Sequence, residues 1–253
     1  MDEVTHDGRT TAYRETNFDD GPTVCYIHGA GGDHGVWVEQ YGDHEGPPAV
    51  AIDLSGHGDS DDVTTAPGME TIDAYADDVV AVCEETDASV LCGNSMGGAV
   101  ALWVALERDL DLDALVLADT GAKLGVDPGF LESLARNFEA AVASLHVPDT
   151  LFHDPDDELV EVSKAGLLET GQAVTLRDFE SSDAFDIRGR LDEIDVPALA
   201  LCGEHDPLTP PSFHEYLEAE LPDCAYVEIA DAAHMPMLER PEKFNESVRS
   251  FLL

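Results

Sequence analysis

Short, continuous apolar runs alternate with segments of helical periodicity along this chain, and this alternation restricts the possible folds more than any other feature. The runs are typical of strands buried on both faces, and they lie at 23–28 (TVCYIH), 49–54 (AVAIDL), 89–92, 114–118, 196–202 (VPALALC) and 225–229. The segments between them predict helices over 71–85, 96–108, 241–251 and from residue 210. Strands that alternate with helices predict an α/β fold, with a mostly parallel sheet of about eight strands flanked by helices.

The alternation stops between residues 121 and 190. No short β-branched run occurs there, and apolar residues such as Phe130 and Phe138 repeat at helical spacing. We therefore predict a core domain made of residues 1–120 and 191–253, interrupted by a helical insertion at 121–190.

The charge balance excludes two classes of partner. The chain has 54 Asp and Glu against 12 Lys and Arg, which gives a net charge of −42. Such a surface repels nucleic-acid phosphates and anionic lipids, so we expect neither nucleic acid nor a membrane as a partner. The acidic excess resembles that of proteins from halophiles, in which molar salt shortens the Debye length to about 3 Å and screens the repulsion. We predict that folding and activity need concentrated salt.

Targeting and redox signals indicate a cytoplasmic protein. Residues 1–10 have neither a basic nor an apolar region, and the longest apolar stretch, 99–106, is far shorter than the roughly 20 residues of a membrane-spanning helix. The five cysteines are odd in number and form no C-x-x-C pair, which argues against a disulfide framework. With 43% hydrophobic residues the chain can bury a core of its own, and we expect a monomer or a small homo-oligomer.

The sequence Gly93-Asn94-Ser95-Met96-Gly97 lies between a predicted strand and a predicted helix. It fits the G-x-S-x-G pattern, in which a sharp strand–turn–helix corner exposes the serine hydroxyl and glycines permit close backbone approach. Ser95 is therefore the candidate nucleophile. Met96 would offer its backbone N–H, at the positive end of the helix, to the negative charge that develops on the substrate oxygen.

A serine nucleophile needs a general base that is itself oriented by a carboxylate. Asp206 and His234 follow the last two predicted strands, and the order Ser, Asp, His is the one expected with this nucleophile turn on a parallel sheet. We predict that Ser95, Asp206 and His234 form a catalytic triad.

Other polar residues near the predicted strand ends are weaker candidates for the acid and the base. Asp119, at the end of another predicted strand, is a second candidate for the acid, and Glu204 is a weaker one. His205 stands beside the predicted acid and should point away from the base, so we expect it to be structural.

No metal or cofactor is predicted. The ten histidines include no H-E-x-x-H motif, and the glycines between 29 and 35 do not fit a dinucleotide fingerprint, because His34 stands where a glycine is needed. Four polar residues of one loop are interpreted as turn and cap residues rather than metal ligands: Asp53, His57, Asp59 and Asp61.

Taken in order, these motifs resemble those of the α/β-hydrolases, in particular small serine hydrolases with a helical cap. The resemblance extends over nearly the whole chain and rests on HGAGG at 28–32, DLSGHGDS at 53–60, GNSMGG at 93–98, GEHDPLTP at 203–210 and AAHMPMLERPEKF at 232–244. It implies the α/β-hydrolase fold, with 121–190 as a cap, or lid, over the site. It also implies that the loop at 28–32 supplies the second oxyanion-hole donor, for which the N–H of Ala30 is the candidate.

The resemblance also bears on the substrate. It implies a small acyl molecule and water as the partners, and the candidate substrate contacts are Gly29, Asn94, Phe138 and Met235. Ser95 excludes the members that use an aspartate nucleophile, such as epoxide hydrolases and dehalogenases.

Within this family we predict a serine hydrolase that cleaves small to medium carboxylic esters or lactones through an acyl-enzyme. The first alternative is a carbon–carbon hydrolase of ring-cleavage products, in which an asparagine like Asn94 is common. Those enzymes typically carry Trp where this chain has Met235, and a cap arginine for the substrate carboxylate, a role open to Arg136 or Arg177. An acyltransferase or a thioesterase is a further alternative. A non-catalytic binding protein is disfavoured because all three triad residues are present.

Overall fold

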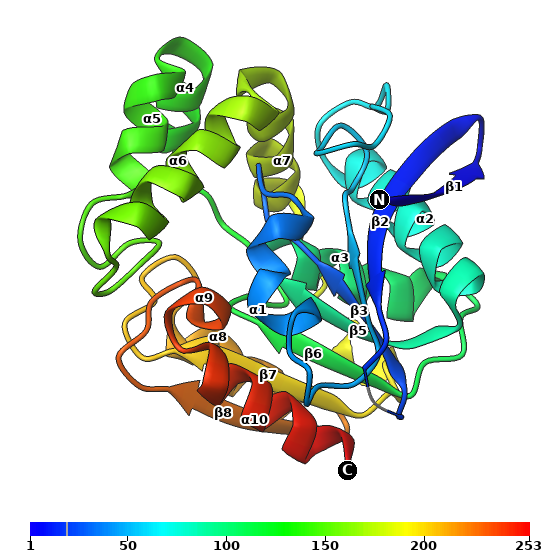
Figure 1. The fold of residues 1–253 in the computed structure, drawn as a ribbon. Coiled ribbons are helices and arrows are strands. Elements are labelled where there is room, and N and C mark those ends of the chain that lie inside the picture. The colour runs from blue at the N-terminus through cyan, green and yellow to red at the C-terminus, as the bar shows by residue number, and fades with distance from the viewer. Residues whose placement is uncertain (19) are drawn as a thin grey trace.

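The computed structural model describes residues 1–18 and 20–253, and within them eight strands form one sheet (Figure 1). The strands are β1 (Asp2–His6), β2 (Arg9–Thr16), β3 (Thr23–Ile27), β4 (Ala49–Ile52), β5 (Ala88–Asn94), β6 (Ala114–Ala118), β7 (Ala198–Gly203) and β8 (Cys224–Ile229). Their order across the sheet is β1-β2-β4-β3-β5-β6-β7-β8. β3 to β8 run parallel, while β1 and β2 join antiparallel at one edge. The predicted α/β fold with about eight mostly parallel strands is confirmed.

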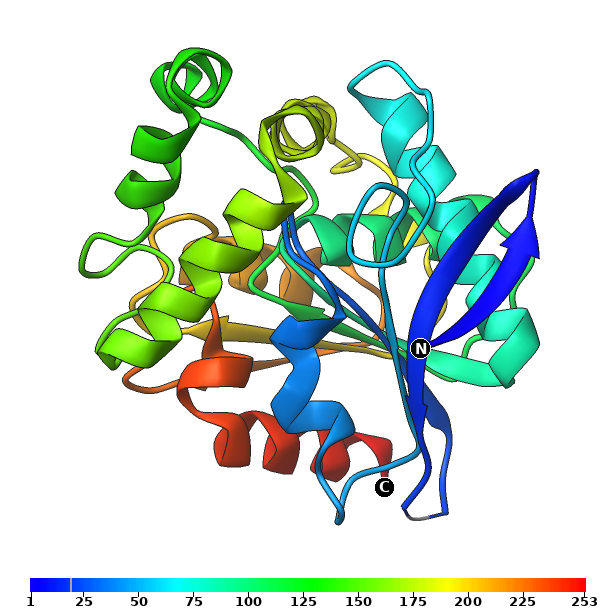
Figure 2. The same ribbon diagram turned by 45° about the horizontal axis from the view of Figure 1, so that its top comes forward.

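Helices cover both faces of this sheet (Figures 1 and 2). The core helices are α1 (Val38–Tyr41), α2 (Met69–Thr86), α3 (Met96–Glu107), α8 (Pro211–Glu220), α9 (Pro236–Glu239) and α10 (Pro241–Leu252), with the 3₁₀ turns η1 (His34–Trp37) and η2 (Leu191–Glu193). α2, α3 and α8 pack on one face in a single apolar cluster that includes Val100 and Leu217. On the other face, Trp37 and Phe244 join a second cluster beneath α9 and α10.

The stripe of apolar residues predicted over 71–85 determines how α2 packs. Ile72, Tyr75 and Val79 have no exposed surface and lie in the same cluster as the strands. Fully burying an apolar side chain stabilises the fold by about 1.5–3 kcal/mol, so this stripe selects the face of α2 that meets the sheet.

The hairpin of β1 and β2 is an element that the sequence analysis does not predict. Its turn is Asp7-Gly8, with φ of 48° and 80°, which lie in the left-handed region that a two-residue type I′ turn requires. β1 has no fully buried residue, and β2 buries only Thr11, Ala12 and Tyr13. A polar edge hairpin of this kind lacks the continuous apolar run that marks the inner strands.

Four helices lie between β6 and β7, inside the segment predicted to be a cap. They are α4 (Pro128–Arg136), α5 (Phe138–Leu145), α6 (Asp157–Thr170) and α7 (Gln172–Ala184). Figures 1 and 2 show them together at one end of the sheet, away from α10. That end is the carboxyl end of the parallel strands, where open α/β sheets bind ligands.

Asp178 of α7 anchors the cap to the core through a buried cluster. Its Oδ2 accepts the backbone N–H of Gly31 at 2.9 Å and lies 2.8 Å from Nε2 of His57, and its Oδ1 accepts the hydroxyl of Tyr75 at 2.6 Å. We call Asp178, His57, Tyr75 and Gly31 the buried seam. Gly31 belongs to the glycine-rich loop after β3, so the seam joins the cap to the loop that contains Ala30.

The surroundings of His57 in this seam favour its positively charged form. Burial by itself lowers the pKa of an imidazole, but the Asp178 carboxylate outweighs burial and raises the pKa of His57. Its Nδ1 lies 3.2 Å from the carbonyl oxygen of Leu54, so both ring nitrogens face acceptors. His57 also forms the predicted turn, since its N–H donates to that same carbonyl at 2.9 Å.

Candidate active site

Ser95 stands at a strained corner between β5 and α3. Its φ of 54° and ψ of −118° lie in a sparsely populated region for a residue with a side chain. Hydrogen bonds hold the corner, because the N–H of Ser95 donates to Ala118 at 3.0 Å and the hydroxyl of Thr120 donates to the Ser95 carbonyl at 2.7 Å. Gly97 is required here, since a Cβ at this position would lie 2.2 Å from the carbonyl oxygen of Ile27.

Asp206 and His234 meet at the carboxyl ends of β7 and β8. Nδ1 of His234 lies 2.8 Å from Oδ2 of Asp206, which also accepts the Thr209 hydroxyl at 2.6 Å. Oδ1 of Asp206 accepts the backbone N–H groups of Leu208 and Thr209. Burial alone would raise the pKa of Asp206, but His234 and these donors outweigh it and hold the pKa well below its usual range. Asp206 is therefore a carboxylate that favours the proton of His234 on Nδ1, which leaves Nε2 with a lone pair that can accept a proton.

Neither of the other candidates for the acid has a hydrogen bond to His234 among the described residues. Asp119 is fully buried, its Oδ1 accepts the N–H of Gly203 at 2.9 Å, and its Oδ2 has no hydrogen-bond partner among the described residues. Burial, together with the nearby charge of Asp206, raises the pKa of Asp119 well above its usual range, which favours its neutral form. Glu204 is exposed and accepts the N–H of Asp231 at 3.3 Å.

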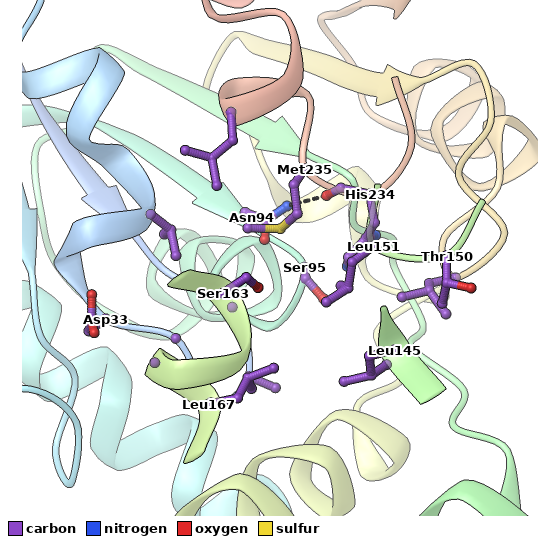
Figure 3. A pocket seen from close by; sticks show the side chains of 18 of the residues that line it. Asp33, Asn94, Ser95, Leu145, Thr150, Leu151, Ser163, Leu167, His234 and Met235 are labelled. Atoms are coloured by element: carbon purple, nitrogen blue, oxygen red, sulfur yellow. Dashed lines mark hydrogen bonds between the residues drawn. The ribbon is translucent and has the colours of Figure 1, made fainter. Parts of the chain in front are cut away.

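Two side chains hold the loop that carries His234. The Asn94 amide donates to the carbonyl of His234 at 3.2 Å, the dashed contact in Figure 3, and Glu239 of α9 accepts the N–H of Ala233 at 2.7 Å. Asn94, a predicted substrate contact, thus also joins the nucleophile turn to the base loop. Glu239 and Thr209 were not predicted: both lie in the quoted motifs at 232–244 and 203–210, but the motifs do not indicate what these two side chains contact.

Two backbone donors near the nucleophile turn have no acceptor in the described part of the chain. Neither the N–H of Ala30 nor that of Met96 has an acceptor within residues 1–18 and 20–253. Ala30 lines the cavity described below, and Met96 is the first residue of α3, where the helix dipole favours negative charge. The predicted oxyanion-hole donors are therefore unpaired and available for a ligand.

A cavity of about 980 Å³ lies between the cap and the core (Figure 3). Ser95 and His234 line it from the core, and apolar side chains such as Leu145, Leu151 and Leu167 line it from the cap. Of the predicted substrate contacts, Gly29, Asn94 and Met235 line the cavity.

Phe138 does not line the cavity. It packs against a small apolar cluster within the cap, formed by Val142, Leu145 and Leu167. Phe130 and Phe179 of the cap contribute aromatic rings to the cavity instead, with their centroids 5.0 Å apart.

The cavity is acidic at its polar positions. The described residues that line it include no Lys or Arg, whereas they include six carboxylates: Asp33, Glu39, Asp127, Asp156, Glu158 and Glu169. Neither candidate cap arginine reaches it. Arg177 lies 2.8 Å from Asp62 and donates to the carbonyl of Ser55, and exposed Arg136 pairs with Glu132 at 2.9 Å.

Two clusters contain side chains that could bind a metal ion, but their ligand atoms already have hydrogen-bond partners or lie beside His234. In Asp33-His34-Asp53, the Oδ1 of Asp53 accepts both the backbone N–H and Nδ1 of His34, and its Oδ2 accepts the N–H of Asp59. Asp61 likewise accepts the N–H of Thr10 at 2.9 Å. The second cluster consists of buried Asp119 and Cys202 with Asp206, which serves His234.

Comparison with known proteins gives the class of this arrangement. The sequence matches the Alpha/beta hydrolase family over residues 26–247. It is 27% identical to 3-oxoadipate enol-lactonase 1 of Acinetobacter baylyi, over 97% of this chain and 94% of that protein. It is 32% identical to the pimeloyl-(acyl-carrier protein) methyl ester esterase of Neisseria meningitidis, over 81% and 68% respectively. A solved structure of a thermophilic esterase is 32% identical and superposes with a TM-score of 0.84, covering 99% of this chain and 96% of its own.

Fold and site together define a hydrolase built on a parallel α/β sheet with a serine at the strand–helix corner. The chain belongs to the alpha/beta hydrolase family and is an enzyme of that family. Among the helices in the described part of the chain, none combines the length and the apolar character that crossing a membrane demands.

Proposed function

We propose that this enzyme cleaves small to medium, uncharged carboxylic esters or lactones through an acyl-enzyme on Ser95. The observation that carries the proposal is that Ser95 and His234 line one cavity, while the Asp206 carboxylate contacts Nδ1 of His234. The relatives named for a methyl ester and an enol-lactone support an ester or lactone as the bond that is cleaved.

In the acylation step, Ser95 Oγ bonds to the substrate carbonyl carbon while Nε2 of His234 takes the hydroxyl proton. The carbonyl oxygen becomes an oxyanion that accepts the N–H groups of Ala30 and Met96. Collapse of this intermediate breaks the bond to the leaving oxygen, which receives the proton from His234. The ionised Asp206 stabilises the imidazolium that exists between the two proton transfers.

In the second step, water replaces the leaving group. His234 takes a proton from water, the resulting hydroxide attacks the acyl carbon, and the proton returns to Ser95 Oγ as the carboxylic acid forms. With a lactone, the alcohol released in the first step remains part of the acyl chain, so a single hydroxy acid is produced.

The cavity supports an uncharged substrate of limited size. A volume of about 980 Å³ lies at the upper end of the range of about 300–1,000 Å³ for small-molecule sites. The absence of Lys and Arg among its described lining residues leaves no partner there for a substrate carboxylate, and the six carboxylates oppose one. Because Arg136 and Arg177 are bound elsewhere, neither supplies the cap arginine that would favour a carbon–carbon hydrolase.

The test is a substrate panel in concentrated KCl that contains aryl esters of increasing acyl length, lactones, an acyl thioester and a ring-cleavage dienoate. We expect short to medium esters or lactones to be turned over best. Ser95→Ala should reduce kcat by about 10⁵-fold or more and abolish labelling by a fluorophosphonate. Near-normal activity of Ser95→Ala, or a clear preference for the dienoate or the thioester, would contradict the proposal.

The identity of the acid is tested by two matched substitutions. Asp206→Asn should lower kcat by about 10⁴-fold, because the imidazolium loses its carboxylate and the tautomer of His234 changes. Asp119→Asn replaces a group that we infer to be neutral and should have a much smaller effect on kcat. A larger loss in Asp119→Asn would assign the role of the acid to Asp119.

A further inference from the structure

Two histidines and an aspartate from three separate segments converge on the outer side of the cap. His153 lies in the cap loop between α5 and α6, His205 immediately precedes Asp206, and Asp231 precedes His234 by three residues. Each offers one ligand atom within 4.8 Å of the others, and the two imidazole rings stack with centroids 3.9 Å apart. We propose that His153, His205 and Asp231 bind a divalent transition-metal ion of the Zn²⁺ type.

The donor set suits such an ion. Imidazole nitrogen and carboxylate oxygen are ligands that Zn²⁺ accepts, and three protein ligands leave a position for water. Ligands on a tetrahedral zinc ion lie about 3.3 Å apart, so the side chains must draw together by about an ångström. The two imidazole rings must also turn out of their stacked arrangement, so that a nitrogen lone pair of each points at the ion. His153 and His205 are partly exposed and Asp231 is exposed, so there is room for this movement.

A carboxylate already orients one of the ligands. Nδ1 of His153 lies 2.6 Å from Oδ1 of Asp149, which leaves Nε2 without a partner in the described part of the chain. Metal-binding histidines usually donate their second ring N–H to a carboxylate in this way, which fixes the tautomer and raises ligand basicity. This feature separates the cluster from a chance grouping of acidic residues. We call His153, His205, Asp231 and Asp149 the open seam.

The surrounding charge also favours a cation. Glu204 accepts the N–H of Asp231 and lies 3.8 Å from Nε2 of His205, which places a further carboxylate beside the cluster. No hydrogen bond from another described residue reaches the Asp231 carboxylate. Its full negative charge is therefore available to an ion.

A bound ion would join three parts of the enzyme. The loop of His153 also contains Thr150 and Leu151, which line the cavity, while His205 and Asp231 lie in the loops of the acid and the base. The N–H of His153 already donates to Glu239 at 2.6 Å, and Glu239 holds the base loop. Metal binding would therefore crosslink the cap loop of His153 to the loops after β7 and β8, away from the buried seam.

The test is calorimetric titration of the chelator-treated full chain with ZnCl₂. Concentrated KCl and about 10 mM MgCl₂ occupy the many surface carboxylates, because Mg²⁺ prefers oxygen ligands. We expect a single zinc ion per chain with a dissociation constant in the micromolar range or below. His153→Asn and His205→Asn should each weaken binding by about 100-fold or more, and Asp149→Asn by about 10-fold.

His44→Asn is the matched control, since His44 is exposed and packs beside Phe18 outside the cluster. It should bind zinc as the wild type does. Ester hydrolysis without zinc verifies that each variant folds, and this readout is separate from zinc binding. Equal binding by all variants, zinc bound at many weak sites, or binding that Mg²⁺ abolishes would each overturn the proposal.

Discussion

Two histidine–carboxylate pairs differ in burial: His57–Asp178 joins the core to the cap, and His153–Asp149 lies within a cap loop whose His153 ring stacks on His205 of the core. In the buried seam, Asp178 uses both oxygens on His57, Tyr75 and Gly31, and no atom of the pair is left for a ligand. In the open seam, His153 and Asp149 form a similar pair at 2.6 Å, but the side chain of Asp149 is 61% exposed. The same pair of side chains is thus a fixed anchor in one place and an adjustable contact in the other.

This difference follows from the cost of desolvation. A buried charge must be matched by several partners or it destabilises the fold, so the buried seam is complete. An exposed pair can exchange its partner for water at little cost and contributes about 0–1 kcal/mol. The open seam can therefore keep unpaired ligand atoms, whereas the buried seam cannot.

The largest expected effect is at the buried seam. Asp178→Asn removes the charge that compensates His57 and should lower the free energy of unfolding by about 3–5 kcal/mol. Urea unfolding in concentrated KCl measures this loss. Asp231→Asn in the open seam is the control and should change stability by less than about 0.5 kcal/mol. Equal losses in the two variants would remove the distinction between the seams.

Salt should act on the surface and leave the buried seam unaffected. Raising KCl from about 0.1 M to about 2 M should increase the thermal midpoint by on the order of 10 °C, because screening relieves the repulsion among surface carboxylates. The midpoints of wild type and Asp178→Asn should rise in parallel, since salt does not reach Asp178. Scanning calorimetry at several KCl concentrations checks both points, and a midpoint that does not change with salt would contradict the first.

The buried seam should also impose a pH dependence. The pKa of His57 in the folded protein is raised above 6.5, so its contribution is complete below about pH 6.5 and is lost as the pH rises through the folded pKa. The pKa of Asp178 is lowered below 3.8, so its contribution is complete above that value and is lost only in strong acid. Between pH 6 and 9 the wild type should lose more stability than His57→Gln, which has no proton to release in this range. Urea unfolding across the pH range measures both profiles, and parallel profiles would refute this.

The smallest effect is expected at the open seam in the absence of metal. His153→Asn breaks a largely exposed pair with Asp149 and a partly exposed stacking contact with His205, and it should change the free energy of unfolding by less than about 1 kcal/mol. Thermal unfolding after chelator treatment measures this. A loss of several kcal/mol would show that the exposed pair is a structural anchor like Asp178.

Sequence reasoning found the inner strands because each is buried on both faces. Val90, Leu91 and Cys92 of β5 have no exposed surface, and such positions tolerate only apolar residues. The edge hairpin was missed because β1 has no fully buried residue and β2 buries only Thr11, Ala12 and Tyr13, so charged residues such as Arg9 and Arg14 are tolerated. The Asp7-Gly8 pair, a known two-residue turn sequence, was the available signal.

The predicted triad residues lie in short motifs, but the motifs do not show which distant side chains position them. Asp178 contacts Gly31 across 147 residues, and Glu239 contacts His153 across 86, so only the folded chain brings them together. Phe138 shows a related limit. Helical spacing predicts that it faces inward, but it cannot tell whether that side meets the cavity or the interior of the cap.

The carboxylates around the cavity also affect what happens after the reaction. Hydrolysis of the proposed uncharged ester would produce an acid that ionises near neutral pH, in a cavity whose described lining residues include Asp33, Glu39 and Glu158 but no lysine or arginine to retain the anion. Molar salt shortens the range of this repulsion to about 3 Å but does not remove it at contact. We therefore expect the product to leave more readily than the substrate, and added carboxylates should be weak competitive inhibitors. On the proposed function, the carboxylates that accept an uncharged ester would repel the acid that it becomes.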